Sequence, residues 1–107
     1  MRQFIVMSSL SLFAALLGAN AHAQGRPDAA AGATLAQNWC ASCHLVTPAQ
    51  KSAAAAGAPS FMALARDPAM TADKLRGFLN KPHPPMPNLS LTRQEIENVV
   101  AYIVSQQ

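Results

Sequence analysis

Apolar residues recur three and four positions apart in four segments of this chain, which is the spacing of one face of an α-helix. The first segment is predicted to form a helix from Asp28 to about Trp39, with an apolar face made of Gly32, Leu35, Ala36 and Trp39. The other three segments follow residues that cap helices well, namely Ser60, Thr71 and Thr92. No segment alternates apolar and polar residues as a strand would, so the sequence predicts an all-α fold of three to four helices.

The last predicted helix has the most specific start signal. Thr92 and Glu95 are spaced as the N-cap and the third helical residue of a capping box, and Leu91 and Ile96 are spaced as the hydrophobic staple that accompanies it. Four aliphatic residues then form one face, with an aromatic residue at its flank: Ile96, Val99, Val100, Ile103 and Tyr102. Such a face is typical of a helix that packs against a core on one side.

Glycine and proline mark the breaks between the predicted helices. Gly57-Ala58-Pro59 interrupts the chain after an Ala-rich segment, residues 51–58, that we interpret as a surface loop. Asp67-Pro68 ends the second helix, and Asn80-Lys81-Pro82 ends the third. The loop that follows contains four prolines within residues 82–87. Because proline fixes φ and prevents regular structure, this loop is predicted to hold its side chains in place with little loss of entropy on folding.

The N-terminus has the pattern of a secretory signal peptide. Arg2 supplies a positive charge, an apolar stretch follows from Leu10 to Leu17, and Ala21-His22-Ala23 places small residues where a signal peptidase cuts. A transmembrane anchor, the alternative, needs about 20 continuous apolar residues, and three serines interrupt the apolar run here. We therefore predict that residues 1–23 are a cleaved signal peptide and that residues 24–107 form a periplasmic domain without stable membrane insertion.

The predicted mature chain of 84 residues is one small domain, near the size at which side chains alone form a marginal core. Without Arg2 it contains seven Lys and Arg against five Asp and Glu, a net charge of +2. Binding to nucleic acid favours a strongly basic surface. The sequence therefore predicts no nucleic-acid partner.

The strongest chemical signal is Cys40-Ala41-Ser42-Cys43-His44, which has the C-x-x-C-H spacing of c-type haem attachment. The two thiols can add to the two vinyl groups of a porphyrin, and the imidazole of His44 then lies where it can bind the iron. Cys40 and Cys43 are the only cysteines in the chain. The motif predicts one covalently bound haem c with its iron, and the haem would also fill the centre of a small core.

Two other kinds of site share part of this motif. A structural zinc site usually needs four protein ligands, and beyond the motif the chain offers only His22 and His83 as nitrogen ligands. A thioredoxin-like dithiol would accompany a βαβ pattern, which the sequence does not contain. Haem attachment is therefore the favoured interpretation, with a zinc site and a dithiol as the alternatives.

Met86 is the favoured second ligand of the iron, opposite His44. It lies between two prolines of the rigid loop, and a thioether binds haem iron and raises its reduction potential. Methionine more commonly fills irregular gaps in a core, and we assign that role to Met62 and Met70. His83 in the same loop is the competing ligand, because a second imidazole also binds haem iron.

The mature chain resembles a class I cytochrome c over nearly its whole length. Members of that family have a glycine eight residues before the first haem cysteine, as Gly32 is here, and an aromatic residue of the last helix crosses it, a role that Tyr102 suits. A proline carbonyl accepts a hydrogen bond from Nδ1 of the haem histidine, and Pro59 is similar to that element. The axial methionine of the family precedes the last helix, as Met86 does.

The chain departs from the family at one position before the motif. Many members have an aromatic residue four positions before the first cysteine, and Ala36 stands there in this chain. Trp39 is expected to compensate by filling space near the haem edge.

The resemblance implies a cytochrome c fold around one haem and an electron carrier rather than an enzyme. If His44 and Met86 both bind the iron, no coordination position is left for a substrate. The implied partners are respiratory redox proteins, such as a quinol-oxidising complex as donor and a terminal oxidase or reductase as acceptor. The protein is expected to be a monomer that forms brief complexes with these partners. The alternatives are a haem enzyme or gas-binding protein with an open sixth position, and a cytochrome subunit docked to a dehydrogenase.

Overall fold

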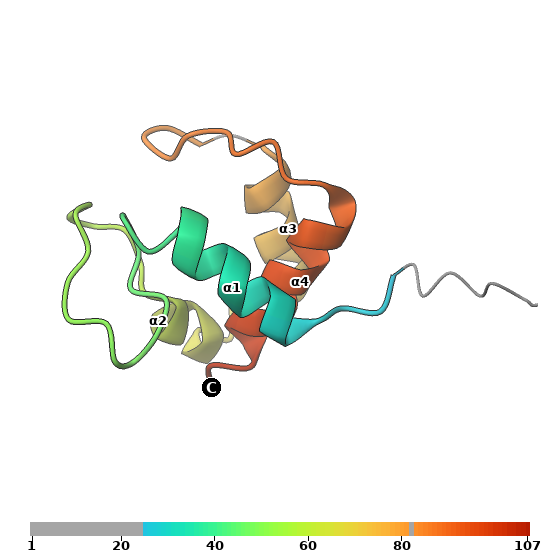
Figure 1. Cartoon of the computed structure of the whole chain (residues 1–107), viewed down its shortest axis with the longest axis horizontal. Coiled ribbons are helices and arrows are strands. Elements are labelled where there is room, and N and C mark those ends of the chain that lie inside the picture. Colours follow the sequence, from blue (N-terminus) through green and yellow to red (C-terminus); the bar gives the residue numbers. More distant parts are fainter. Residues whose placement is uncertain (1–24, 82) are drawn as a thin grey trace, which may run out of the picture.

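The structure, a computed structural model, describes residues 25–81 and 83–107. The predicted signal peptide, residues 1–23, lies outside the described residues. The described part forms four helices and no strand (Figure 1): α1 (Ala29–Trp39), α2 (Phe61–Arg66), α3 (Ala72–Asn80) and α4 (Arg93–Val104). The predicted all-α fold is confirmed. None of these four helices has the length and apolar character that crossing a membrane requires.

Each helix begins at the capping residue that the sequence indicated. Asp28 accepts hydrogen bonds from two backbone N–H groups of α1 at 2.9 and 3.1 Å, and the hydroxyls of Ser60 and Thr71 cap α2 and α3. The capping box of α4 is complete, because the Glu95 carboxylate accepts from the Thr92 N–H at 2.7 Å and the Thr92 hydroxyl accepts from the Glu95 N–H. The hydrogen bond from the Thr92 backbone lowers the pKa of the Glu95 carboxyl. These caps satisfy N–H groups that a helix start would otherwise leave free.

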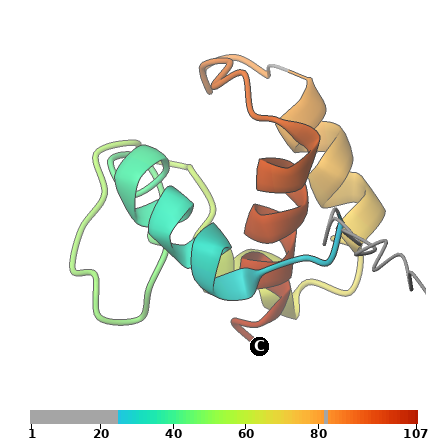
Figure 2. The same ribbon diagram turned by 45° about the vertical axis from the view of Figure 1, so that its right-hand side comes forward.

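Helices α1 and α4, from opposite ends of the described chain, pack across each other (Figure 2). At this crossing Gly32 lies so close to the backbone carbonyl of Asn98 that a Cβ atom on residue 32 would overlap the carbonyl group. The Asn98 side chain also accepts a hydrogen bond from the Asp28 N–H at 2.9 Å. The expected close approach at Gly32 is therefore present, with Asn98 as its direct partner and Tyr102 beside it.

The buried core lies around α4. Its members are Ala36, Cys40, Val46, Phe61, Leu75, Ile96, Val99, Val100, Tyr102 and Ile103. Half of these residues belong to α4, which confirms the apolar face predicted for the last helix. The one hydroxyl in the core, on Tyr102, donates a hydrogen bond to the Val46 carbonyl oxygen at 2.6 Å, so its burial leaves no polar group without a partner.

Trp39 does not share the buried face of α1, contrary to the helical spacing. Its side chain is 58% exposed, whereas Ala36 is fully buried. Trp39 is the last residue of α1, and the C-terminal end of α1 diverges from α4 beyond the crossing (Figure 2). The predicted place of Trp39 on the buried face is wrong because helices that cross at an angle stay in contact near the crossing point and separate away from it.

Gly32→Ala is expected to lower the free energy of unfolding by about 1–3 kcal/mol, because the added methyl group overlaps the Asn98 backbone and α4 must shift to accommodate it. Gly77→Ala in α3 is the matched control, since no atom beyond the neighbouring backbone of its own helix lies within 4 Å of a Cβ placed there. Thermal unfolding of both haem-loaded variants measures the difference. An unchanged midpoint for Gly32→Ala would contradict the close packing of α1 on α4.

Candidate functional site

An apolar cavity of about 270 Å³ is lined by the segment after α1, by α2, α3 and α4, and by the loops before α3 and before α4. Its walls are formed by Cys40, His44, Pro59, Phe61, Leu64, Met70, Leu75, Phe78, Leu79, His83, Met86 and Ile103. Four of the five residues predicted from the sequence to bind the cofactor line this one cavity, and so does the competing ligand His83. Cys43 and Trp39 are not among the wall residues.

The C-x-x-C-H motif forms a tight turn directly after α1. Cys40 follows the last residue of α1 and donates its N–H to the Ala36 carbonyl at 2.8 Å. The carbonyl of Cys40 accepts from the N–H groups of Cys43 at 3.1 Å and of His44 at 2.8 Å. Cys40 is only 6% exposed, whereas Cys43 is partly exposed. The turn therefore places the two sulfurs at different depths, with the imidazole next in the chain.

The environment of Cys40 favours an uncharged sulfur. Burial raises the pKa of the Cys40 thiol to about 11, and the nearby Cys43 adds to this increase. At neutral pH the Cys40 sulfur is therefore protonated. A thioether is also uncharged, whereas a zinc ligand must be a thiolate. The apolar surroundings of Cys40 thus suit attachment of a porphyrin better than binding of a zinc ion.

His44 is oriented by contacts on one side of its ring. Its Nδ1 lies 2.7 Å from the carbonyl oxygen of Pro59, and the ring packs against Phe61 with 5.7 Å between the ring centroids. Because a carbonyl oxygen can only accept, Nδ1 carries the proton and Nε2 keeps a free lone pair. A neutral imidazole held in this way can bind iron through Nε2.

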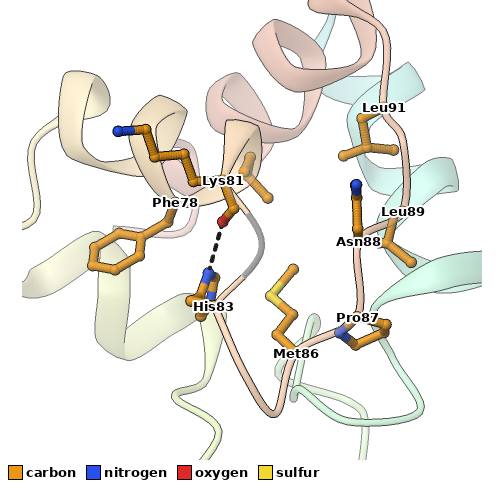
Figure 3. Close-up of a pocket in the computed structure, with 9 residues that line it drawn as sticks. Phe78, Lys81, His83, Met86, Pro87, Asn88, Leu89 and Leu91 are labelled. Carbon is orange, nitrogen blue, oxygen red and sulfur yellow. Dashed lines mark hydrogen bonds between the residues drawn. The ribbon is translucent and has the colours of Figure 1, made fainter.

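The loop between α3 and α4 contributes Met86 and His83 to the same cavity. The Met86 side chain extends into the space between the two arms of this loop (Figure 3). Its backbone N–H donates to the His83 carbonyl at 2.9 Å. The His83 ring packs edge-on to Phe78 with 5.2 Å between the ring centroids, and its Nδ1 lies 3.3 Å from the Lys81 carbonyl oxygen. The loop therefore brings a thioether and an imidazole to one wall of the cavity.

Other wall residues were not identifiable as site residues from the sequence. The helical spacing identifies Leu75, Phe78 and Leu79 only as the apolar stripe of the third helix, and the structure turns this stripe toward the cavity. Met70, interpreted as core filler, also lines the wall. Periodicity shows which residues share a face of a helix, but it does not show what that face packs against.

The residues around the cavity, together with Cys43 in the turn that starts at Cys40, fit a covalently bound haem. Two thiols, an imidazole with a free nitrogen and a thioether are the groups that hold a c-type haem and its iron. The wall contains no Asp, Glu, Lys or Arg side chain, as contact with the apolar face of a porphyrin requires. An all-α fold with this donor set defines a small c-type haem protein.

Comparison with known proteins identifies the family. Residues 27–103 match the family described as cytochrome C oxidase, cbb3-type, subunit III. The chain is 49% identical over 78 residues to a protein named cytochrome c-552 from Bradyrhizobium diazoefficiens, and the alignment covers 73% of this chain and 74% of the relative. No solved structure matches the chain. The chain therefore belongs to the cytochrome c family, as a small class I c-type cytochrome.

Membership of this family establishes the cofactor and the general function. The chain carries covalent haem c with iron, it transfers electrons, and its partners are other redox proteins. The predicted family, fold and cofactor are confirmed. The zinc and dithiol interpretations of the two cysteines are not compatible with this assignment.

Proposed function

We propose that this protein is a periplasmic electron carrier whose single haem is attached through Cys40 and Cys43 and whose iron is held by His44 and Met86. The observation that carries the proposal is the apolar cavity, because Cys40, His44 and Met86 line it from two segments far apart in the sequence. Cys43 completes the attachment by its spacing from Cys40. Family membership supports the electron-transfer role.

In this proposal the residues of the chain hold the ligands in place, tune their donor strength and keep water from the cavity. The haem supplies the change between ferric and ferrous iron. The Pro59 carbonyl accepts a hydrogen bond from the Nδ1–H of His44, which makes the imidazole a more basic ligand. A Met86 thioether bound to the iron would favour the ferrous state and raise the reduction potential. Iron held by both His44 and Met86 would leave no coordination position for a substrate.

Met86 is preferred over His83 because of the contacts that each side chain makes. The His83 ring packs on Phe78, and its Nδ1 lies near the Lys81 carbonyl, so the ring is part of the wall that supports the loop. The Met86 backbone is fixed by the prolines on either side and by its hydrogen bond to His83. This rigidity holds a soft, neutral sulfur ligand at the cavity.

A quinol-oxidising complex is the proposed donor, and a terminal oxidase or reductase is the proposed acceptor. The family description names a subunit of a cbb3-type oxidase, so the comparison favours a terminal oxidase. Redox partners of this kind meet through small, short-lived interfaces, which suits a monomer. Trp39, 58% exposed and next to Cys40, offers an apolar contact beside the motif.

Two alternatives keep the haem but change the role of the protein. A haem enzyme or gas-binding protein would leave the sixth position of the iron open. A cytochrome subunit would stay docked to a larger enzyme such as a dehydrogenase, and the family description, which names an oxidase subunit, gives this alternative some support. Gel filtration of a native extract separates a free carrier, which elutes as a monomer, from a docked subunit.

If the protein is exported through the proposed signal peptide, residues 1–23 are removed and the mature chain should begin at Gln24. Mass spectrometry of protein produced with haem maturation should give the mass of residues 24–107 plus one haem. A chain that keeps Arg2 and fractionates with membranes would instead support an uncleaved anchor.

Replacing Cys40 or Cys43 by Ser should weaken haem retention, and replacing both should leave only haem that acid–acetone extracts, because no thioether bond remains. Ser42→Ala, between the two cysteines, is the matched control and should retain its haem. Haem that stays with the doubly substituted chain through extraction would show that attachment does not depend on these thiols.

Met86→Ala is expected to open one axial position of the iron. The wild type should be six-coordinate and low-spin in both oxidation states, whereas the variant should bind carbon monoxide readily and have a lower reduction potential, because a soft sulfur ligand has been lost. Absorption spectra with and without carbon monoxide, together with redox titration, measure both effects.

His83→Ala is the matched variant in the same loop. It should keep the low-spin spectrum and a potential close to that of the wild type, because His83 lies outside the coordination sphere in this proposal. Rapid binding of carbon monoxide by the wild type, or loss of the low-spin spectrum in the His83 variant alone, would rule out ligation by Met86.

A further inference from the structure

The segment after the C-x-x-C-H motif is closed by a turn that directs Gln50 back toward the motif. The Gln50 N–H donates to the carbonyl and the hydroxyl oxygens of Thr47, both at 3.2 Å. Pro48 follows Thr47 and fixes φ at the second position of this four-residue turn. The half-buried side chain of Gln50 therefore starts from a restrained backbone and points into the loop that contains His44.

The Gln50 amide bonds to the backbone of that loop with both of its ends. Its Oε1 accepts from the Val46 N–H at 3.0 Å. Its Nε2 lies within donating distance of three carbonyl oxygens, of Ala41 at 2.8 Å, His44 at 3.0 Å and Ser52 at 3.0 Å. The orientation of the amide is determined by these partners, because exchanging the oxygen and the nitrogen would face an acceptor with three carbonyls.

Neighbouring backbone groups of the loop have other partners. The Leu45 carbonyl accepts from the Phe61 N–H at 2.9 Å, and the Val46 carbonyl accepts from the Tyr102 hydroxyl at 2.6 Å. The backbone of Val46 is therefore held at both of its polar groups, by Gln50 at its N–H and by Tyr102 at its carbonyl. Loss of the Gln50 amide would release the bonds to the carbonyls of Ala41 and His44 and to the Val46 N–H together.

We propose that Gln50 is a positioning residue for His44, a role that rests on the proposed function of His44 as a haem ligand. Pro59 holds the imidazole at Nδ1, and Gln50 holds the backbone carbonyl of the same residue. Two restraints at opposite ends of His44 fix the plane of the ring as well as its position. Gln50 is not among the residues that line the cavity, so it would act on the iron through His44.

The test uses two variants of the haem-loaded protein. Gln50→Met keeps the length of the side chain and removes all of its hydrogen bonds. Gln50→Glu keeps an acceptor for the Val46 N–H but has no donor for the three carbonyls. Its effect therefore distinguishes the contribution of the Oε1 acceptor from that of the Nε2 donor. Gln94→Met on α4 is the control, because Gln94 bonds to Arg26 and Asn98, away from the motif.

Two measurements report on His44 itself. In Gln50→Met the Val46 N–H should exchange with solvent roughly fivefold faster, the factor expected for the loss of one ordinary hydrogen bond. The His44 Nδ1–H should also exchange faster, because a less restrained ring keeps its hydrogen bond to Pro59 for less of the time. The low-spin electron paramagnetic resonance signal of the ferric protein should broaden, because the imidazole plane then takes a range of orientations. Gln50→Glu should broaden the signal while leaving exchange of the Val46 N–H slow. Gln94→Met should change neither quantity.

The outcomes separate this proposal from the proposed function. A lower melting temperature of Gln50→Met with an unchanged resonance signal and unchanged exchange of the His44 Nδ1–H overturns the positioning role and leaves ligation by His44 intact. If Gln50→Met does not fold, fast exchange of the Val46 N–H in the wild type overturns it instead. A wild type whose spectra show no histidine ligand contradicts the proposed function, whatever the Gln50 variants do.

Discussion

The crossing of α1 and α4 at Gly32 is the contact on which the position of the haem motif depends. It sets the position of α1 in the fold, and the turn that starts at Cys40 follows directly after the last residue of α1. It also holds Tyr102 next to Gly32, from where the tyrosine hydroxyl reaches the Val46 carbonyl at 2.6 Å. Burial raises the pKa of Tyr102, so this hydroxyl stays protonated and remains a donor. One helix contact thus restrains the motif before Cys40 and after His44.

The helices could be predicted from the sequence because their signals are local. Asp28, Ser60, Thr71 and Thr92 each bond to N–H groups two or three residues later, so a short stretch of sequence contains both partners. The buried face of α4 follows from spacing within twelve residues. Trp39 is the exception that shows the limit of this reasoning. Its spacing agrees with a buried face, but whether a partner helix is still adjacent depends on the crossing angle, which is a tertiary property.

The candidate site could be predicted only in part, because its residues differ in how local their chemistry is. Cys40, Cys43 and His44 form a motif within five residues and can be recognised from the sequence alone. The stripe of Leu75, Phe78 and Leu79 can be recognised as apolar, but the cavity that it faces appears only when α2, α3 and the proline-rich loop are assembled. Gln50 gives no signal at all, since a single glutamine after a turn looks like a solvent-exposed residue.

The distribution of charge determines which residues can control the potential of the proposed carrier. Arg76 forms its ion pairs with Asp73 at 2.6 Å and with Glu97 at 2.7 Å, on the outside of α3 and α4, where solvent weakens their field. The cavity wall has no such charges. A charge in an apolar wall would shift the energy of ferric relative to ferrous iron strongly. In its absence, the residues that would control the potential in the proposed ligation are Met86 and His44, the latter with its hydrogen bond to Pro59. The hydrogen bonds that hold the loops of His44 and Met86 would then contribute to the redox chemistry as well as to the fold.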